Sequence, residues 1–451
     1  MRFLILVFLV SIFGGELKAQ KSNGFGGGEY KERKRVACLD SDKRIGIKAR
    51  LKPLIKKFRD RESNSSEETK SISYFTLPIK QSESLQYLNA YSISNFVDHD
   101  SSSDIMDYDC YKRAYDGHLG TDFSTWPFPW YLYNNDYIDV VAAAPGTIIE
   151  KADGNFDMNC ECEGNWNAVY LIHDDGTTAW YGHLKLNSLT DKAVGESVER
   201  GEFLGKLASS GCSTGPHLHF EVYDSEGELI DPFAGDCNDL NSESYWQDQG
   251  DYWVPRLNTI STHAYEAVFG CPATEEDPAF KNVFIPGEMI YFYGFFRDYL
   301  RTTNSQWRII DPNGIVYDTW EHTPPLTYAF SFWYWYFELP FDAVEGEWTF
   351  EVEYQGEKMT HNFTYGETSS TNNTESLNYY VYPNPSQETI SIDNLSAEAG
   401  KVTLINVDGA TLAISINDAN SIDVSDINPG VYLIQYEDTQ GNLVTEKIIV
   451  Q

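Results

Sequence analysis

The sequence has few basic residues for its length. Of its 451 residues, 33 are Lys or Arg and 68 are Asp or Glu, which gives a formal net charge of −35. Proteins that bind nucleic acid usually carry the opposite balance, because the phosphate backbone attracts basic surfaces. We therefore exclude nucleic acid as a partner. The acidic excess is better explained by solubility outside the cell than by a specific partner.

Long apolar runs are also scarce. The run from Phe3 to Phe13 spans 11 residues, which is too short to cross a bilayer as a helix. It follows Arg2 and precedes the small residue Ala19, a pattern typical of a secretory signal peptide over residues 1–19. An uncleaved membrane anchor would need a longer run. We therefore expect export and a mature chain without a transmembrane segment.

The sequence contains seven cysteines. An exported chain can form disulfides, and the odd number leaves at least one cysteine without a partner. We predict a Cys212–Cys237 disulfide, because this pair would bracket a predicted strand that carries two histidines. The segment Cys160-Glu161-Cys162 resembles a metal motif, but nothing at zinc-finger spacing accompanies it, so disulfides are favoured.

Residues 20–72 differ in composition from the rest of the chain. Thirteen of the 33 Lys and Arg residues lie between Lys31 and Arg61. Five apolar residues fall near helical spacing, although Pro53 would strain a continuous helix; they are Ile47, Leu51, Leu54, Ile55 and Phe58. One interpretation is a solvated basic linker. The other is a pro-segment that docks on the acidic remainder and is later removed.

The remaining sequence predicts an all-β chain with three domains. Residues 73–236 contain short strands and hairpin signals such as Asp174-Asp175-Gly176. Residues 237–366 are rich in aromatic residues and alternate as half-buried strands do, which favours a β-sandwich accessory domain. Its aromatic residues are expected mainly in the core, with a carbohydrate-binding face as the alternative. A polar linker over 367–377 leads to a small β-domain at 378–451.

Two histidines two residues apart form the most informative pattern in the chain. His217 and His219 lie in a predicted strand, where residues i and i+2 project from the same face. Neutral imidazoles and ionised carboxylates bind zinc, and a catalytic zinc site keeps one position for water. We assign zinc binding to His118, Asp122 and His219. His183 and His217 then suit proton transfer and hydrogen bonding to the oxyanion.

The segments around these residues resemble the signature of the lysostaphin-like (LytM-type, β-lytic) zinc metallopeptidases. They are Asp116–Phe123, Tyr181–Leu184 and Ser213–Glu221. The resemblance implies an antiparallel β fold of the duplicated hybrid motif type, with a narrow groove and one zinc ion in the catalytic domain. By position in the motifs, it also implies the same division between zinc ligands and catalytic histidines.

The resemblance further implies an endopeptidase that cleaves peptidoglycan stem or cross-bridge peptides. An endopeptidase of elastase type, acting on glycine-rich proteins, is the second hypothesis, and a non-catalytic wall-binding adhesin is the third. The chain departs from the family in an aromatic stretch at Trp126–Tyr133. We expect Trp126 and Trp130 to wall the groove and contact the substrate. The alternative is that they pack on the following β-domain.

The C-terminal region resembles the sorting domain of type IX secretion cargo. The resemblance rests on Tyr382–Pro385, Asn428–Tyr432 and Lys447–Val450. It implies that type IX secretion machinery carries the protein through an outer membrane, followed by release or attachment to the outer cell surface. The alternative is one more small β-sandwich module. We expect the exported protein to be a monomer.

Overall fold

The computed structural model describes residues 24–30, 39, 41–62, 73–271 and 276–366, together with shorter stretches between 381 and 450. The predicted signal peptide, the predicted linker over residues 367–377 and Cys38 lie outside the described residues. The chain divides into two compact units, Met1–Glu367 and Thr368–Gln451. The predicted domain boundary within the first unit, near residue 236, remains a prediction. Neither helix in the described residues has the length and hydropathy needed to span a membrane.

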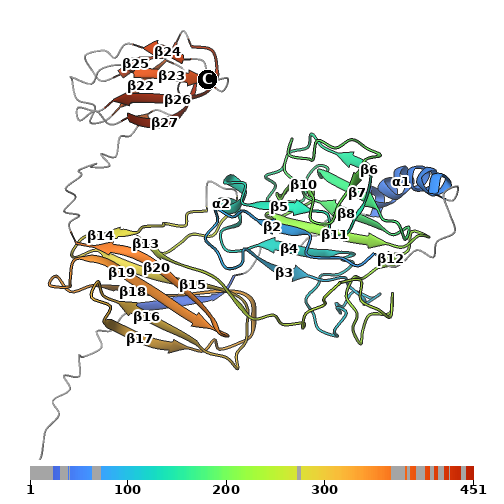
Figure 1. Ribbon diagram of the computed structural model, residues 1–451, viewed down its shortest axis with the longest axis horizontal. Coiled ribbons are helices and arrows are strands. Elements are labelled where there is room, and N and C mark those ends of the chain that lie inside the picture. Colours follow the sequence, from blue (N-terminus) through green and yellow to red (C-terminus); the bar gives the residue numbers. More distant parts are fainter. Residues whose placement is uncertain are drawn as a thin grey trace, which may run out of the picture. The chain divides into compact units, whose positions relative to one another are not determined.

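The described residues are mostly antiparallel strands, which confirms the predicted all-β fold class (Figure 1). The largest sheet of the first unit has the strands β3 (Tyr91–Asn95), β4 (Thr121–Thr125), β6 (Gly146–Ala152), β7 (Ala168–Ile172), β8 (Thr178–Gly182), β9 (Ser197–Val198), β11 (His217–Tyr223) and β12 (Leu229–Ile230). Their order is β3-β4-β11-β8-β7-β6-β9, with β12 paired to β11. A smaller sheet has β2 (Ile79–Gln81), β5 (Ile138–Val141) and β10 (Phe203–Lys206), in the order β10-β5-β2.

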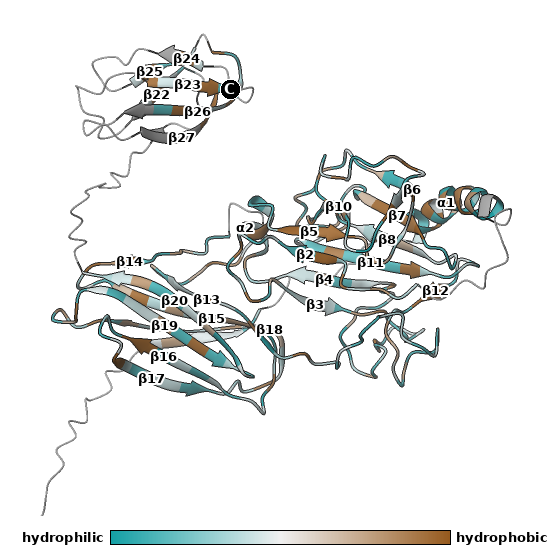
Figure 2. Ribbon diagram, in the orientation of Figure 1, coloured by the Kyte–Doolittle hydropathy of each residue, from teal (hydrophilic) through white to brown (hydrophobic). Residues whose placement is uncertain are grey.

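The central strands of this large sheet are buried on both faces. Every residue of β7, β8 and β11 is buried, and Figure 2 shows β5 and β7 as predominantly hydrophobic. Leu218, Phe220 and Val222 of β11 point into the main core. The residues between them point to the opposite face, because side chains alternate along a strand. That face therefore buries polar side chains of β11, which need partners inside the protein.

A helix covers part of this second face. The helix α1 (Ser41–Glu62) has Ile47 and Leu51 buried in a cluster with aromatic residues of the sheet. Pro53 lies inside the helix without ending it. Pro53 and Ala49 are both exposed, so water can reach the carbonyl group that the proline leaves without a helical donor.

The second helix, α2 (Pro129–Asn134), is short and follows β4. Two further sheets of the first unit form a sandwich, which we call the accessory sandwich. One has β1 (Gly24–Glu29), β13 (Arg256–His263), β15 (Met289–Tyr299) and β18 (Tyr328–Glu338), in the order β1-β18-β15-β13. The other has β14 (Val283–Phe284), β16 (Ser305–Ile310), β17 (Val316–His322), β19 (Gly346–Tyr354) and β20 (Glu357–Tyr365), in the order β14-β20-β19-β16-β17.

Aromatic residues fill the core of the accessory sandwich, as the sequence predicts. Phe292, Trp307 and Phe350 are fully buried and pack together between its sheets. The strand β1 was not expected, because the sequence places residues 24–29 in a linker or pro-segment. It joins the sheet as the edge strand next to β18.

The second unit is a small β-structure with two sheets. Its strands are β21 (Val381–Tyr382), β22 (Thr389–Ile392), β23 (Val402–Asn406), β24 (Thr411–Ile414), β25 (Ser421–Asp423), β26 (Gly430–Glu437) and β27 (Leu443–Val450). The sheet orders are β21-β22-β25 and β24-β23-β26-β27. Ile390, Leu404 and Ile434 are fully buried in its core, which gives the small β-domain that the sequence predicts.

Three disulfides lie in the described residues, which confirms disulfide formation but not the predicted pairing. They are Cys110–Cys237, Cys160–Cys271 and Cys162–Cys212. The predicted Cys212–Cys237 bond is wrong. Cys212 forms an antiparallel bridge with Cys162, and the backbone N–H of Cys237 donates to Tyr108, close to Cys110. Cys212 and Cys237 therefore each pair with a cysteine in a loop that is distant in the sequence.

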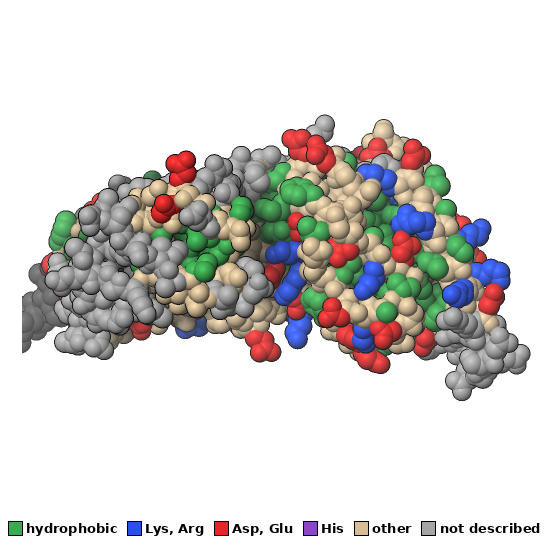
Figure 3. All heavy atoms as spheres, turned by 90° about the horizontal axis from the view of Figure 1, so that it is seen from above, with side chains coloured by type: hydrophobic (Ala, Val, Ile, Leu, Met, Phe, Trp, Pro, Cys, Tyr) green, Lys and Arg blue, Asp and Glu red, His purple; other side chains and the backbone are tan. Residues whose placement is uncertain are grey.

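Charged side chains of both signs are interspersed over the described surface seen in Figure 3. On this face, the described acidic side chains therefore do not form one continuous patch. Such a distribution agrees with the interpretation that the charge serves solubility.

Candidate metal centre

The strands β4 and β11 bring two of the predicted ligands together. Their register places His219 directly opposite Asp122. His118 lies in the loop before β4, and its Nε2 atom is 3.2 Å from Oδ2 of Asp122 and 3.2 Å from Nδ1 of His219. All three side chains are buried, and one candidate ligand atom from each lies within 4.8 Å of the others.

Neighbouring polar groups orient these side chains. The Nδ1–H of His118 donates to the carbonyl oxygen of Phe96 at 2.6 Å, which leaves Nε2 to face Asp122. Asn95 donates from Nδ2 to Oδ2 of Asp122 at 2.8 Å. Outer partners of this kind fix the orientation of metal ligands in proteins. Sequence reasoning missed Asn95, because β3 reaches Asp122 only through the strand register.

His219 lies between two carboxylates. Its Nδ1 atom is 2.7 Å from Oδ1 of Asp122, and its Nε2 atom is 2.8 Å from Oε1 of Glu221. Burial raises the pKa of Asp122, but the positive charges that His118 and His217 carry when they are protonated outweigh burial and hold this pKa well below its ordinary value. An ionised Asp122 requires a proton or a metal ion at Nδ1. Two imidazoles and one carboxylate are a donor set that zinc accepts, so these residues fit a zinc ion.

Glu221 is a second residue that sequence reasoning left without a role. It follows His219 at i+2, so it shares the same face of β11. Burial raises the pKa of Glu221, but hydrogen bonding to His219 and the charge of Arg44 bring it down to about 2. Arg44 of α1 donates from Nη2 to Oε1 at 2.8 Å, and the Tyr223 hydroxyl donates to Oε2. The alternation His-x-His-x-Glu was the signal that could have found it.

The two predicted catalytic histidines lie beside this cluster. The Nδ1–H of His183 donates to the carbonyl oxygen of Ser210 at 2.5 Å, and that of His217 donates to Gly215 at 2.8 Å. In a neutral ring, each of these bonds makes Nε2 the unprotonated nitrogen. The ring centroids of His183 and His217 are 4.5 Å apart, and Nε2 of His217 is 3.6 Å from Oδ1 of Asp122.

Comparison with known families identifies this part of the chain. Residues 132–232 match the model of peptidase family M23. The chain carries an M23 peptidase domain. The match includes His183, His217 and His219, whereas His118 and Asp122 precede it. Residues 380–451 match the secretion system C-terminal sorting domain, which confirms the resemblance to type IX cargo.

The curated relatives share only a stretch of the chain. The DD-carboxypeptidase/endopeptidase Mpg of Neisseria meningitidis is 37% identical over 105 residues, which is 23% of this chain and 23% of Mpg. The peptidoglycan DD-endopeptidase ShyC of Vibrio cholerae is 34% identical over 83 residues, 18% of each chain. This chain thus spans about a quarter or less of their length. The solved catalytic domain of lysostaphin from Staphylococcus simulans is 29% identical, with a TM-score of 0.19, over 26% of this chain and 76% of that domain.

The helix α1 lies on the face of the M23 sheet that carries the histidines. Glu221, which Arg44 of α1 contacts, pairs in register with Trp180 of β8, and α1 packs on Trp180 and Trp166. Trp166 in turn lies 5.9 Å from the ring of His219. A cavity of about 340 Å³ remains between α1 and this face. The docking that the pro-segment hypothesis expects is present for α1, and removal of the segment stays a prediction.

Trp126 and Trp130 do not line a groove, so their predicted contact with substrate is wrong. Trp126 is 0% exposed and packs between Phe269 and Phe295 of the accessory sandwich region. Trp130 is buried in a cluster with Tyr133. The alternative interpretation, packing on the following β-domain, therefore holds for Trp126, which covers apolar surface of β15 and β18. Trp130 instead packs on Ala208 and on the Cys160–Cys271 disulfide.

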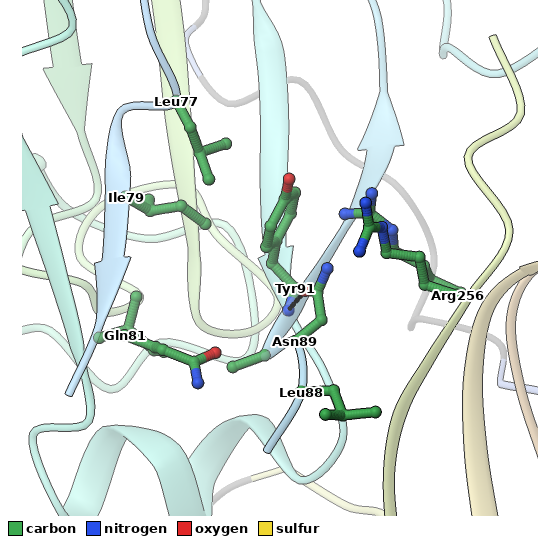
Figure 4. Close-up of a pocket in the computed structure, with 10 residues that line it drawn as sticks. Leu77, Ile79, Gln81, Leu88, Asn89, Tyr91 and Arg256 are labelled. Carbon is green, nitrogen blue, oxygen red and sulfur yellow. Dashed lines mark hydrogen bonds between the residues drawn. The ribbon is translucent and has the colours of Figure 1, made fainter. Parts of the chain in front are cut away.

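A further cavity lies away from the candidate metal centre. It has a volume of about 310 Å³ and is lined by Leu77, Ile79, Gln81, Tyr91 and Arg256, among others (Figure 4). None of the predicted site residues lines it. Its described lining holds no histidine, cysteine or carboxylate, the side chains that usually bind metal ions in proteins.

Proposed function

We propose that this protein is a secreted, zinc-dependent endopeptidase that hydrolyses peptide bonds in peptidoglycan stem or cross-bridge peptides. The convergence of His118, Asp122 and His219 in one buried cluster, beside two further histidines and within an M23 domain, carries the proposal. The relatives named for DD-endopeptidase activity support the substrate class.

The proposed chemistry assigns a role to each side chain. His118, Asp122 and His219 would hold the zinc ion, which supplies Lewis-acid activation of a water molecule and of the scissile carbonyl group. His183 and His217 present unprotonated Nε2 atoms beside the cluster. One of them would take a proton from the attacking water and then donate this proton from Nε2 in a hydrogen bond to the oxyanion. The other would donate to the oxyanion in its protonated form, with its proton taken from the solvent.

The C-terminal unit supports the proposed location. Its sorting domain favours passage by type IX secretion machinery after signal-peptide export, with release or attachment at the outer cell surface. The exported protein is proposed to act as a monomer. A chain without residues 378–451 is expected to stay out of the medium, measured by immunoblot of medium and cells. Its normal appearance in the medium would contradict the sorting role.

Two other functions are compatible with some of these observations. Hydrolysis of glycine-rich proteins would use the same centre and differ only in substrate. A wall-binding adhesin need not hold zinc, so metal analysis of the purified protein separates it from both peptidases. One zinc ion per chain favours a peptidase, and a metal-free chain that still binds walls favours the adhesin.

Product analysis tests the proposed substrate. Purified protein is incubated with peptidoglycan, and the products are identified by mass spectrometry, with His217→Ala as the control. New peptide termini made by the wild type and absent from the control identify the bond that is cut. Intact peptidoglycan, together with cleavage of a glycine-rich protein, would replace the proposed substrate by the second one.

A further inference from the structure

The strand β1 is a glycine-rich segment held at the edge of the accessory sandwich. Its sequence, Gly-Phe-Gly-Gly-Gly-Glu, pairs antiparallel with β18 over six residues, from Gly24 opposite Tyr336 to Glu29 opposite Ser331 (Figure 1, blue strand along β18). β18 pairs with β15 on its other side. In the described residues, β1 is thus what covers the hydrogen-bonding edge of β18.

The pairing leaves no room for side chains at three positions of β1. A Cβ atom at Gly24 would overlap the ring of Tyr336, and one at Gly26 would overlap the ring of Tyr334. Gly27 has a φ angle of +126°, and a Cβ atom there would overlap a backbone oxygen of β18. The edge of β18 therefore accepts an extended chain that has glycine at the positions facing Tyr334 and Tyr336.

The tyrosines that impose this requirement are held by their neighbours. Tyr334 stacks on Tyr293 of β15 with ring centroids 4.6 Å apart, and Tyr336 stacks on Tyr291 at 4.8 Å. The stacking fixes the rings over the edge, so the requirement for glycine belongs to β18 and β15. Phe25 is 67% exposed, so β1 contributes little apolar surface of its own to the core.

We propose that the edge of β18 binds glycine-rich extended peptides of other molecules by strand addition, and that β1 is an internal occupant of this site. Backbone hydrogen bonds supply the affinity of such an added strand, and the tyrosine rings supply the selectivity. The sequence of β1 shows what the site accepts. This binding goes beyond the proposed function, because it lies in the accessory sandwich and requires neither a metal ion nor catalysis.

Release of β1 tests the proposal in the full chain. Gly27→Ala places a methyl group against the backbone of β18, whereas Gly46→Ala, in α1, is a matched control because a Cβ atom there meets nothing within 4 Å. Both are made in a His217→Ala background, which keeps the probe uncleaved. The probe is a pentaglycine peptide with a fluorescein-labelled C-terminal lysine, and binding is measured by fluorescence anisotropy.

We expect Gly27→Ala to bind the probe about tenfold more tightly than the control, because an internal occupant lowers apparent affinity by the fraction of open sites. A probe with alanine at its second and fourth positions should bind weakly. Tyr334→Ala together with Tyr336→Ala should admit the alanine probe. A chain without residues 24–29 serves as a second way to open the edge.

Several outcomes would overturn the proposal. One is that neither opened chain binds pentaglycine more tightly than the control. Another is that the glycine and alanine probes bind equally well. A third is that the opened chains dimerise on gel filtration and bind no probe, which would assign the edge to a second copy of the chain. Failure of the peptidase assay would leave this binding result unaffected, so the two proposals are tested separately.

Discussion

The M23 sheet and the accessory sandwich use the same strand geometry for different chemistry. Along β11, alternate residues on one face are polar and include His219 and Glu221, which are bonded into one network. Along β18, the corresponding alternation presents Tyr334 and Tyr336, which stack on neighbouring rings. Each region receives an element from residues 24–62: α1 covers the M23 sheet, and β1 covers the edge of β18. The residues on one strand face, and not the sheet itself, therefore distinguish the candidate metal centre from the proposed peptide-accepting edge.

Buried histidines make the contrast sharper. His263 of the accessory sandwich is fully buried, but its ring nitrogens face the Ser261 hydroxyl and the carbonyl oxygen of Pro278. Burial lowers the pKa of His263 to about 3, so it stays neutral. His219 instead faces two carboxylates, of Asp122 and Glu221. A buried histidine therefore becomes a candidate ligand only where the fold also supplies negative charge.

The largest expected effect is loss of metal binding at the proposed zinc site of the M23 domain. His219→Ala should abolish both zinc binding and activity, because it removes a ligand. His263→Ala should retain one zinc ion per chain, measured by elemental analysis after dialysis. His217→Ala should retain zinc and lose about 10²- to 10⁴-fold in turnover, since it removes a proton-transfer group. Full activity of His217→Ala, or zinc loss in His263→Ala, would refute the assigned division of roles.

The next effect concerns the buried aromatic contact between the two regions. Trp126→Ala should lower the free energy of unfolding by about 3–5 kcal/mol, the usual range for a large buried side chain. KM should not change, because Trp126 has no exposed surface for substrate. Phe341→Ala is the control, as this side chain is 78% exposed. Denaturant unfolding measures the stability, and a raised KM with unchanged stability would restore the groove role.

Much of the candidate site could be predicted from the sequence because strand alternation is local. The i, i+2 spacing of His217 and His219 fixes their common face without knowledge of the rest of the fold. The all-β class likewise follows from short alternating segments and turn residues. His118 and Asp122 were joined to them from their residue types and from the resemblance to a family. Local spacing could not join them, because β4 and β11 pair across about a hundred residues of sequence.

What escaped prediction depends on contacts between distant segments. The burial of Trp126 against Phe269, the partners of Cys212 and Cys237, and the addition of β1 to β18 all depend on tertiary packing. Composition also misled: the glycines of residues 24–29 are typical of a flexible linker, whereas here their lack of side chains is what lets the strand fit. A local pattern cannot distinguish these two uses of glycine.

The third effect tests the support of the metal ligands. Glu221→Gln should weaken zinc affinity about 10- to 100-fold, because the carboxylate that orients His219 loses its charge. Glu351→Gln is a matched change in the accessory sandwich, where the buried Glu351 pairs with Arg308 and Lys358. It should leave zinc affinity unchanged. Competition with a chromophoric chelator measures the zinc affinity of both variants. Equal affinities of Glu221→Gln and Glu351→Gln would show that Glu221 does not support the metal ligands.

The smallest effect separates two arginines of α1. Arg44 is 14% exposed and pairs with the fully buried Glu221, whereas Arg50 is 52% exposed and pairs with Glu150. Arg44→Ala should weaken the docking of α1 by about 1.5 kcal/mol, because it removes a charged hydrogen bond to a buried acceptor. Arg50→Ala should weaken the docking of α1 by less than about 1 kcal/mol, since water screens the charges of an exposed pair. Hydrogen exchange of the α1 amides measures the docking, and equal exchange in the two variants would contradict the difference.

The pH dependence of the Arg44 pair has a defined sign. The folded-state pKa of Glu221, about 2, lies below its ordinary value of 4.5, so its ionised form is favoured in the folded protein. The stabilisation is therefore fully present above pH 4.5 and is lost as the pH falls from 4.5 towards 2. Wild type and Arg44→Ala should differ in α1 protection at neutral pH and converge only in this acid range. Convergence between pH 5 and 7 would mean that a group other than Glu221 holds α1 on the sheet.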